Sequence, residues 1–191
     1  MKLYITAGHQ VINGKGTGAH GFRDEAVEAV KLRDALCDEL TQRGLSVLKE
    51  GEATSLNKVI DWLTRNVREK DIVIDIHFNA AVNPNAQGTE VLIPEKYTQT
   101  ELKLAHDLAK AISASLTIPM RRGKLIYSGV KTETESHRSS IGILNRPWRA
   151  HNVLLEVAFV TNYKEMTDLY PNNFHALVHN LADVICNYAK A

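Results

Sequence analysis

The sequence contains little cysteine and few aromatic residues. Among its 191 residues there are two cysteines, Cys37 and Cys186, and 6% of the residues are aromatic. Two cysteines are too few for a disulfide framework, and neither has a nearby partner at metal-ligand spacing, which argues against a cysteine-based zinc site. Both fall in apolar helical patterns, so we expect them to be buried thiols.

An excess of one charge and long hydrophobic runs are also missing. The 23 Lys and Arg residues nearly balance the 22 Asp and Glu residues, and the net charge of +1 gives no reason to expect a nucleic acid or an anionic membrane as a partner. No apolar run approaches the roughly 20 residues that span a bilayer. The apolar stretch before Gly8 is too short for an export signal. We therefore expect a soluble protein that is cytoplasmic as encoded.

The length of 191 residues and the hydrophobic content of 44% fit one compact domain over residues 1–191. Short apolar runs alternate with segments of helical spacing, and Gly44 stands where a glycine commonly ends a helix. We expect strands at about 3–7, 45–48, 71–78, 89–93 and 153–160, and helices at about 24–43, 55–67, 100–116 and 174–188. This alternation predicts a single-domain α/β fold with a largely parallel central sheet flanked by helices. Residues 119–145 break the pattern, which is typical of a functional or mobile loop.

Polar residues stand where the predicted strands end. His9 follows the first strand, His77 ends the third, and Glu156 lies inside the last one. Glu25 opens the first long helix, which is anchored behind the first strand. Because ligand sites in open α/β sheets lie outside the carboxyl ends of the strands, we expect these four side chains to meet.

Two histidines and one carboxylate, with a fourth position left to water, form a standard catalytic zinc set. Such an ion lowers the pKa of its bound water to about 7 and polarises a carbonyl group. A second carboxylate is then needed as general base and as proton donor to a leaving nitrogen. Glu156 is the candidate, because a carboxylate within an apolar strand must be paired or coordinated. Taken singly, Glu25 also suits the start of any helix and His9 also suits a turn.

Three other groups compete for these roles. Glu90 in the fourth strand is an alternative base. The alternation of residues in that strand does not decide which face of the sheet Glu90 lies on, and we rank it second to Glu156. His20 in the glycine-rich loop is an alternative ligand or substrate contact, although loop histidines are more often exposed. His175 and His179 have the spacing of a helical metal pair, but Ala176 replaces the Glu of that motif, and we expect a solvated helix flank.

Two further positions are candidates for substrate contacts. Asn79, two residues past His77, is expected to support the ligand or to form a hydrogen bond with the substrate. Arg149, close before the last strand, is the first candidate among the basic residues, because arginine binds carboxylates in a bidentate manner. The other basic residues in or beside the irregular segment are expected to be mostly solvated: Arg121, Arg122, Lys124, Arg138 and Arg146.

Four blocks cover nearly the whole chain: Thr-Ala-Gly-His-Gln with its glycine-rich loop and Gly-Phe-Arg-Asp-Glu, then Asp-Ile-His-Phe-Asn-Ala, Gly-Thr-Glu-Val-Leu, and Leu-Leu-Glu-Val-Ala-Phe-Val-Thr-Asn. In this order they resemble the zinc-dependent N-acetylmuramoyl-L-alanine amidases of the Amidase_3 type. The resemblance implies a mixed sheet flanked by helices, with a substrate groove over the metal. It also implies that His9, Glu25 and His77 bind one zinc ion. Glu156 would be the catalytic acid and base.

The chain departs from this family pattern at two places. Family members commonly carry Asp-Pro before the Gly-His, where this chain has Thr6 and Ala7. A Ser often stands two residues before the second His, where this chain has Asp75. Neither change touches an implied ligand. Asp75 either adds charge near the site or points to the other face of its strand, and we expect the latter.

The resemblance implies hydrolysis of the amide bond between N-acetylmuramic acid and L-alanine, in peptidoglycan or in muropeptides whose stem peptides offer carboxylates to arginine. The alternatives are a zinc peptidase or deacetylase that acts on another amide, and a non-catalytic cell-wall binding module, against which Glu156 argues. Without an export signal, we expect the enzyme to act on the wall after release, as an endolysin does, or on internalised wall fragments.

Overall fold

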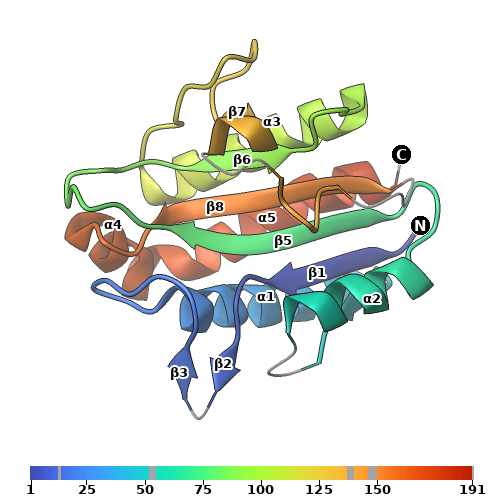
Figure 1. Ribbon diagram of the computed structural model, residues 1–191, viewed down its shortest axis with the longest axis horizontal. Coiled ribbons are helices and arrows are strands. Elements are labelled where there is room, and N and C mark those ends of the chain that lie inside the picture. The colour runs from blue at the N-terminus through green and yellow to red at the C-terminus, as the bar shows by residue number, and fades with distance from the viewer. Residues whose placement is uncertain (13, 52–54, 137–139, 146–149, 191) are drawn as a thin grey trace.

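The centre of the molecule is a six-stranded sheet with the strand order β4-β1-β5-β8-β6-β7 (Figure 1). The computed structural model describes residues 1–12, 14–51, 55–136, 140–145 and 150–190. The strands of this sheet are β1 (Leu3–Ala7), β4 (Val47–Lys49), β5 (Ile72–Asn79), β6 (Glu90–Ile93), β7 (Val130–Thr132) and β8 (His151–Phe159). Only β6 and β8 pair in antiparallel orientation among the described strands of this sheet. The predicted α/β fold with a mixed, largely parallel sheet is therefore confirmed.

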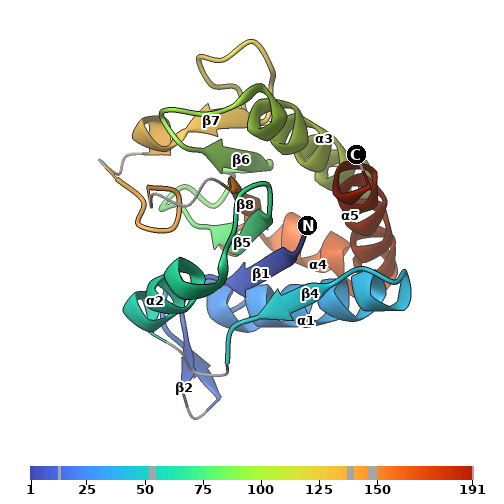
Figure 2. The same ribbon diagram turned by 90° about the vertical axis from the view of Figure 1, so that its right-hand side faces the viewer.

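Helices cover the two faces of the sheet unequally. They are α1 (Glu25–Gln42), α2 (Leu56–Asn66), α3 (Gln99–Leu116), α4 (Tyr163–Asp168) and α5 (Phe174–Ala189). Helices α1, α3 and α5 pack on one face, and α2 packs on the other (Figure 2). Because side chains alternate along a strand, Ile74 of β5 joins the large core under three helices, whereas Val73 joins the smaller core under α2.

Local signals in the sequence set the ends of the helices. Asp24 precedes α1 and its side chain accepts a hydrogen bond from the backbone of Val27, which caps the helix. Gly44 follows the last turn of α1 with a φ of 82°, a conformation that glycine adopts without strain. Thr98 and Glu101 form a capping box at the start of α3. In the described part of the chain, we find no helix that combines the length and the apolar character needed to cross a membrane.

Short elements lie where the sequence predicted only loops. In the glycine-rich loop, β2 (Val11–Ile12) and β3 (Lys15–Gly16) form a small antiparallel hairpin. In the irregular segment 119–145, β7 extends the sheet and is followed by the 3-10 helix η1 (Glu133–Ser136). A π-helical segment, η2 (Leu169–Asn173), joins α4 to α5. These elements are too short for a hydrophobic period to reveal them.

The carboxyl ends of β1, β5 and β8 lie at one edge of the sheet (Figure 1). The parallel register pairs Ala7 of β1 with Ile76 of β5, and His77 of β5 with Glu156 of β8. His9 follows β1 directly, and Glu156 lies in β8. The strand of His77, β5, therefore has a candidate site residue on each neighbouring strand. The topology thus brings residues from distant parts of the chain to one place.

Candidate metal centre and active site

Three of the predicted residues converge at this edge. Glu25 is the first residue of α1, and its carboxylate lies between the two imidazole rings, with Oε1 3.1 Å from Nδ1 of His77 and Oε2 3.2 Å from Nε2 of His9. The potential ligand atoms of the three residues all lie within 4.8 Å of one another. Within the described residues, this is the one cluster of such side chains with the spacing of a metal site.

Glycines allow the three side chains to approach so closely. A Cβ atom on Gly8 would lie 2.3 Å from Cε1 of His77, so the backbone of this loop passes directly against the imidazole ring. Gly18 has a φ of 113°, and a Cβ atom there would lie 2.6 Å from Cγ of His9 and 2.9 Å from Oε2 of Glu25. The next residue, Ala19, donates its backbone N–H to Glu25 at 2.9 Å. The glycine-rich loop therefore wraps the cluster.

The three residues also fit a metal ion chemically. Two imidazole nitrogens and one carboxylate oxygen are ligands that zinc prefers, and ligands about 2.1 Å from a tetrahedral ion lie about 3.4 Å apart. The contacts that Glu25 makes with His77 and His9, at 3.1 Å and 3.2 Å, are close to that spacing. The His9 side chain is 27% exposed, which leaves the cluster open to solvent on one side.

The charges of the cluster are strongly coupled. Burial by itself would raise the pKa of Glu25, but hydrogen bonds from His77 and His9 outweigh it and hold that pKa far below its ordinary range. Burial by itself would lower the pKa of His77, but the carboxylates of Asp75 and Glu25 outweigh it and raise that pKa well above its ordinary value. Ionised carboxylates that face two imidazoles make the site attractive to a cation.

Asp75 does not point to the other face of its strand, as the sequence had led us to expect. Its Oδ2 atom lies 3.1 Å from Nε2 of His77, and its Oδ1 atom accepts a hydrogen bond of 2.7 Å from the hydroxyl of Thr6. The prediction was wrong because residues two apart in a strand share a face. Asp75 and His77 are therefore on the same side of β5.

Glu156 stands beside the cluster. It is the register partner of His77 on the neighbouring strand β8, and in a parallel pair the partners' side chains lie on the same face of the sheet. Its backbone carbonyl accepts a hydrogen bond from the Thr89 hydroxyl, and its negative charge helps to raise the pKa of His77. A cavity of about 280 Å³ is lined by Glu156, His77 and Asn79 among others. Glu156 thus has the position of a base that acts near the ligands.

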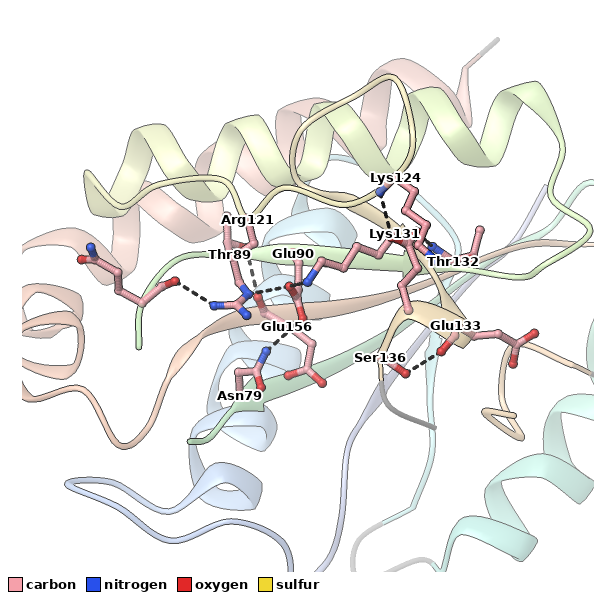
Figure 3. Close-up of polar contacts among 12 residues, drawn as sticks. Asn79, Thr89, Glu90, Arg121, Lys124, Lys131, Thr132, Glu133, Ser136 and Glu156 are labelled. Carbon is pink, nitrogen blue, oxygen red and sulfur yellow. Dashed lines mark hydrogen bonds and ion pairs between the residues drawn. The ribbon is translucent and has the colours of Figure 1, made fainter. Parts of the chain in front are cut away.

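Glu90 lies opposite Glu156 in the antiparallel register of β6 and β8, but in other surroundings. Figure 3 shows Arg121 and Lys131 reaching its carboxylate from two sides, with Nε of Arg121 at 2.6 Å and Nζ of Lys131 at 2.5 Å. The amide of Asn79 donates to the same carboxylate at 3.2 Å. The carboxylate of Glu90 is therefore occupied by two cations and an amide, which makes Glu90 a poor rival to Glu156 as base. Asn79 supports this network beside the metal site.

The remaining candidates lie elsewhere. His20 is 63% exposed at its side chain and pairs with Asp24 at 3.1 Å, away from the ligand cluster. His175 and His179 are exposed on α5, as expected of a solvated helix flank. Arg149, the proposed substrate contact, lies outside the described residues, as do Arg138 and Arg146.

Hollows extend on both sides of His77. A cavity of about 430 Å³ is lined by His9, Asp75 and His77 together with Ile141 and Leu154 of the opposite wall. The cavity next to Glu156 shares His77, Ile141 and Leu154 with it. A larger cavity of about 1080 Å³ lies at the opposite edge of the sheet, where β5 and β8 begin, and none of the site residues lines it. The two cavities that meet at His77 are therefore the candidate substrate groove.

A family model described as N-acetylmuramoyl-L-alanine amidase, Amidase_3, matches residues 3–187. The chain belongs to this amidase family. The predicted family and enzyme class, a hydrolase of amide bonds in peptidoglycan, are thereby confirmed. Among curated proteins, no sequence matches the amidase.

Solved structures of similar fold cover almost the whole amidase. The catalytic domain of the CD27L endolysin, which targets Clostridia difficile, is 22% identical, with 98% of this chain and 97% of that chain aligned and a TM-score of 0.74. The catalytic domain of the amidase CwlV from Paenibacillus polymyxa is 20% identical, with 100% and 99% aligned and a TM-score of 0.75. The amidase Ami1 from Mycobacterium smegmatis is 16% identical, with 100% and 97% aligned and a TM-score of 0.78. At these identities the similarity shows the fold.

Sequence reasoning did not predict the roles of Thr6 and Lys131. Thr6 stood out only as a departure from the family pattern, because a threonine in a strand is ordinary. Lys131 lies 41 residues from Glu90 along the chain, so only the fold brings the two together. The position of Asp75 could have been predicted, because it stands two residues before His77 and residues two apart in a strand lie on the same face.

Proposed function

We propose that this amidase holds one zinc ion through His9, Glu25 and His77, and that it hydrolyses the amide bond between N-acetylmuramic acid and L-alanine of peptidoglycan. The observation that carries the proposal is the convergence of three ligand atoms within 4.8 Å at the end of the sheet. Glu156 is the general base and acid, because it is the register partner of His77 on the neighbouring strand and is a further carboxylate beside the three clustered ligands.

When bound, zinc supplies a Lewis acid that lowers the pKa of water and polarises an amide carbonyl. The protein provides the rest of the chemistry. Glu25 lies between the two imidazole rings with one carboxylate oxygen next to each, so the three side chains would hold the ion together. Glu156 takes a proton from the attacking water, and it returns this proton to the nitrogen of L-alanine as the C–N bond breaks. The lactyl carboxylate and the free amine leave without a covalent enzyme intermediate.

The groove supports a substrate that extends to both sides of the scissile bond. The cavity on the His9 side, of about 430 Å³, and the cavity on the Glu156 side, of about 280 Å³, meet at His77. An amide bond placed at His77 therefore has room for the sugar on one side and for the stem peptide on the other.

Mass spectrometry of digested peptidoglycan tests the reaction. The expected products carry new amino termini on L-alanine and no new reducing sugar ends. Other new ends would mean that the enzyme is a peptidase or deacetylase. Binding to a wall that stays intact would mean a non-catalytic module.

Substitution of Glu156 tests its role. Glu156→Gln should keep the bound zinc and lower turnover by about 10²–10⁴-fold, the usual contribution of general acid–base catalysis. His77→Ala should lose both zinc and turnover. Glu135→Gln is a matched control, because Glu135 lines the same cavity but accepts hydrogen bonds from the backbone of Lys124 and Thr132. Full activity of Glu156→Gln would remove Glu156 from the mechanism.

A further inference from the structure

A buried pair of polar side chains joins β1 to β5 behind the metal ligands. Thr6 and Asp75 are register partners on the two strands, and both are buried. One carboxylate oxygen of Asp75, Oδ1, accepts the Thr6 hydroxyl at 2.7 Å. The other oxygen, Oδ2, faces Nε2 of His77 at 3.1 Å. Both oxygens of this buried carboxylate are thus engaged, which fixes its orientation.

This geometry determines which nitrogen of His77 is free to bind a metal. An imidazole that donates a hydrogen bond from Nε2 to a carboxylate carries its proton there, and its Nδ1 lone pair is left available. Nδ1 of His77 is the atom that faces Glu25, at 3.1 Å, inside the ligand cluster. A carboxylate behind a ligating histidine also increases the basicity of the ligand.

We propose that Asp75 is a positioning residue for the metal centre: it holds His77 in the Nε2-protonated tautomer, and Thr6 holds Asp75. The proposal rests on the proposed function in that it takes His9, Glu25 and His77 as the metal ligands. It adds a residue that does not touch the ion but sets its affinity.

The Thr6–Asp75 pair places one hydroxyl and one carboxylate opposite each other between β1 and β5. The negative charge stands on the strand of His77, in direct contact with the ligand.

Zinc affinity of the whole purified chain, measured by competition with a chromogenic chelator, tests the role of Asp75. Asp75→Ser should lower the affinity about 10–100-fold, the usual effect of removing such a partner. Asp75→Asn has the same shape and keeps a hydrogen-bond acceptor without the charge, so its loss should be smaller. The Asp75→Asn measurement decides the matter if Asp75→Ser does not fold. Unchanged affinity in a folded Asp75 variant would overturn the proposal.

A matched control separates this effect from a loss of stability. Asp71 is also a buried aspartate, and it stands just before the start of β5, where it accepts the backbone N–H groups of Lys2 and Arg68. Asp71→Asn should destabilise the fold but leave the zinc affinity within about threefold. Equal losses of zinc affinity in Asp71→Asn and Asp75→Asn would mean that Asp75 is merely structural.

A swap of the two side chains tests whether they act as a pair. Thr6→Asp alone places two carboxylates opposite each other in the core, which is unfavourable. The double variant Thr6→Asp, Asp75→Ser again has one carboxylate and one hydroxyl, and it should bind zinc more tightly than Asp75→Ser alone. A double variant that binds no better than Asp75→Ser would overturn the role of the pair.

The tautomer gives a readout that does not depend on activity. In the zinc-loaded chain, long-range ¹H–¹⁵N spectra should show His77 protonated at Nε2, and this proton should exchange with water more slowly in wild type than in Asp75→Ser. Protonation of wild-type His77 at Nδ1 with zinc bound would contradict the proposal. Because none of these measurements uses substrate, failure of the amidase assay and failure of this proposal are distinguishable.

Discussion

Glu90 and Glu156 face each other across β6 and β8, but their neighbours give them different roles. Arg121 and Lys131 form ion pairs with the carboxylate of Glu90, so this carboxylate is already occupied by two cations. Glu156 is the register partner of His77 instead. In the proposed mechanism proton transfer depends on Glu156, and Glu90 holds two cations beside it (Figure 3).

Substitution of Glu90 should separate these roles. Glu90→Gln leaves Lys131 without its ion pair, and the Lys131 side chain is 12% exposed, so we expect a loss of about 1–3 kcal/mol in the free energy of unfolding. Turnover should remain within about tenfold of wild type, because the base is still present. Urea denaturation and a turnover assay measure the two effects. If Glu90→Gln is folded, loaded with zinc and as inactive as Glu156→Gln, the base has been wrongly assigned.

Because Gly18 lies so close to His9, we expect a side chain at this position to weaken zinc binding. Gly18→Ala would bring a Cβ atom to 2.6 Å from the His9 ring, and it should therefore displace that ligand and weaken zinc binding at least tenfold. Gly14 in the same loop is a matched control, because it also has a positive φ but nothing lies within 4 Å of its Cβ position. Gly14→Ala should show the backbone strain, about 1–2 kcal/mol, without the loss of affinity. Chelator competition on both variants would decide, and equal zinc affinities would contradict the prediction.

At the scale of elements, the start of α1 links the helix to the glycine-rich loop. The Asp24 carboxylate accepts the backbone N–H of Val27 in the first turn and that of Gly16 in β3. Glu25 follows directly, so the cap of the helix also positions a ligand. The hairpin and the helix are therefore coupled through one side chain.

Removing the cap should affect both stability and zinc affinity. Asp24→Ala should cost about 1 kcal/mol in the free energy of unfolding, as the loss of a helix cap does, and it should also weaken zinc binding because Glu25 loses its support. Thr98→Ala removes the capping box of α3, far from the ligands, and should cost similar stability while leaving the affinity unchanged. Thermal unfolding and chelator competition test the pair. The coupling is refuted if both variants bind zinc equally well.

Elements long enough to show a period could be predicted from the sequence. The strand expected at 71–78 is Ile72–Asn79, and the helix expected at 100–116 is Gln99–Leu116. β7 has three residues and depends on pairing with β6, so its own residues carry no pattern.

The candidate site could be predicted where its residues stand at strand ends. His9 and His77 were named for that reason, Glu156 was named because a carboxylate stands within an apolar strand, and the structure brings the three together. Glu25 depended on the family resemblance, because a glutamate in a first helical turn is common. The network around Glu90 could not be predicted, because its partner Arg121 lies 31 residues away and is brought close only by the fold.

At the scale of the whole molecule, the core contains ionisable groups whose protonation is tied to folding. Cys37 and Cys186 are buried, unpaired thiols, as expected from the sequence. Burial raises the pKa of the Cys37 thiol from 9.0 to about 12. The folded protein therefore keeps this proton at pH values where the unfolded chain loses it.

This difference predicts a loss of stability in alkali. Because the pKa of Cys37 is raised by folding, its contribution to stability is complete below about pH 9 and is lost as the pH rises toward 12. At about pH 10.5 the loss should reach ~2 kcal/mol. Cys37→Ala is less stable at neutral pH because of the cavity it leaves, but its stability should fall less steeply above pH 9. Urea denaturation of both proteins from pH 7 to 10.5 measures how steeply the free energy of unfolding falls with pH. All other titrating groups are shared by the two proteins. Parallel curves would therefore show that Cys37 does not resist ionisation in the folded core.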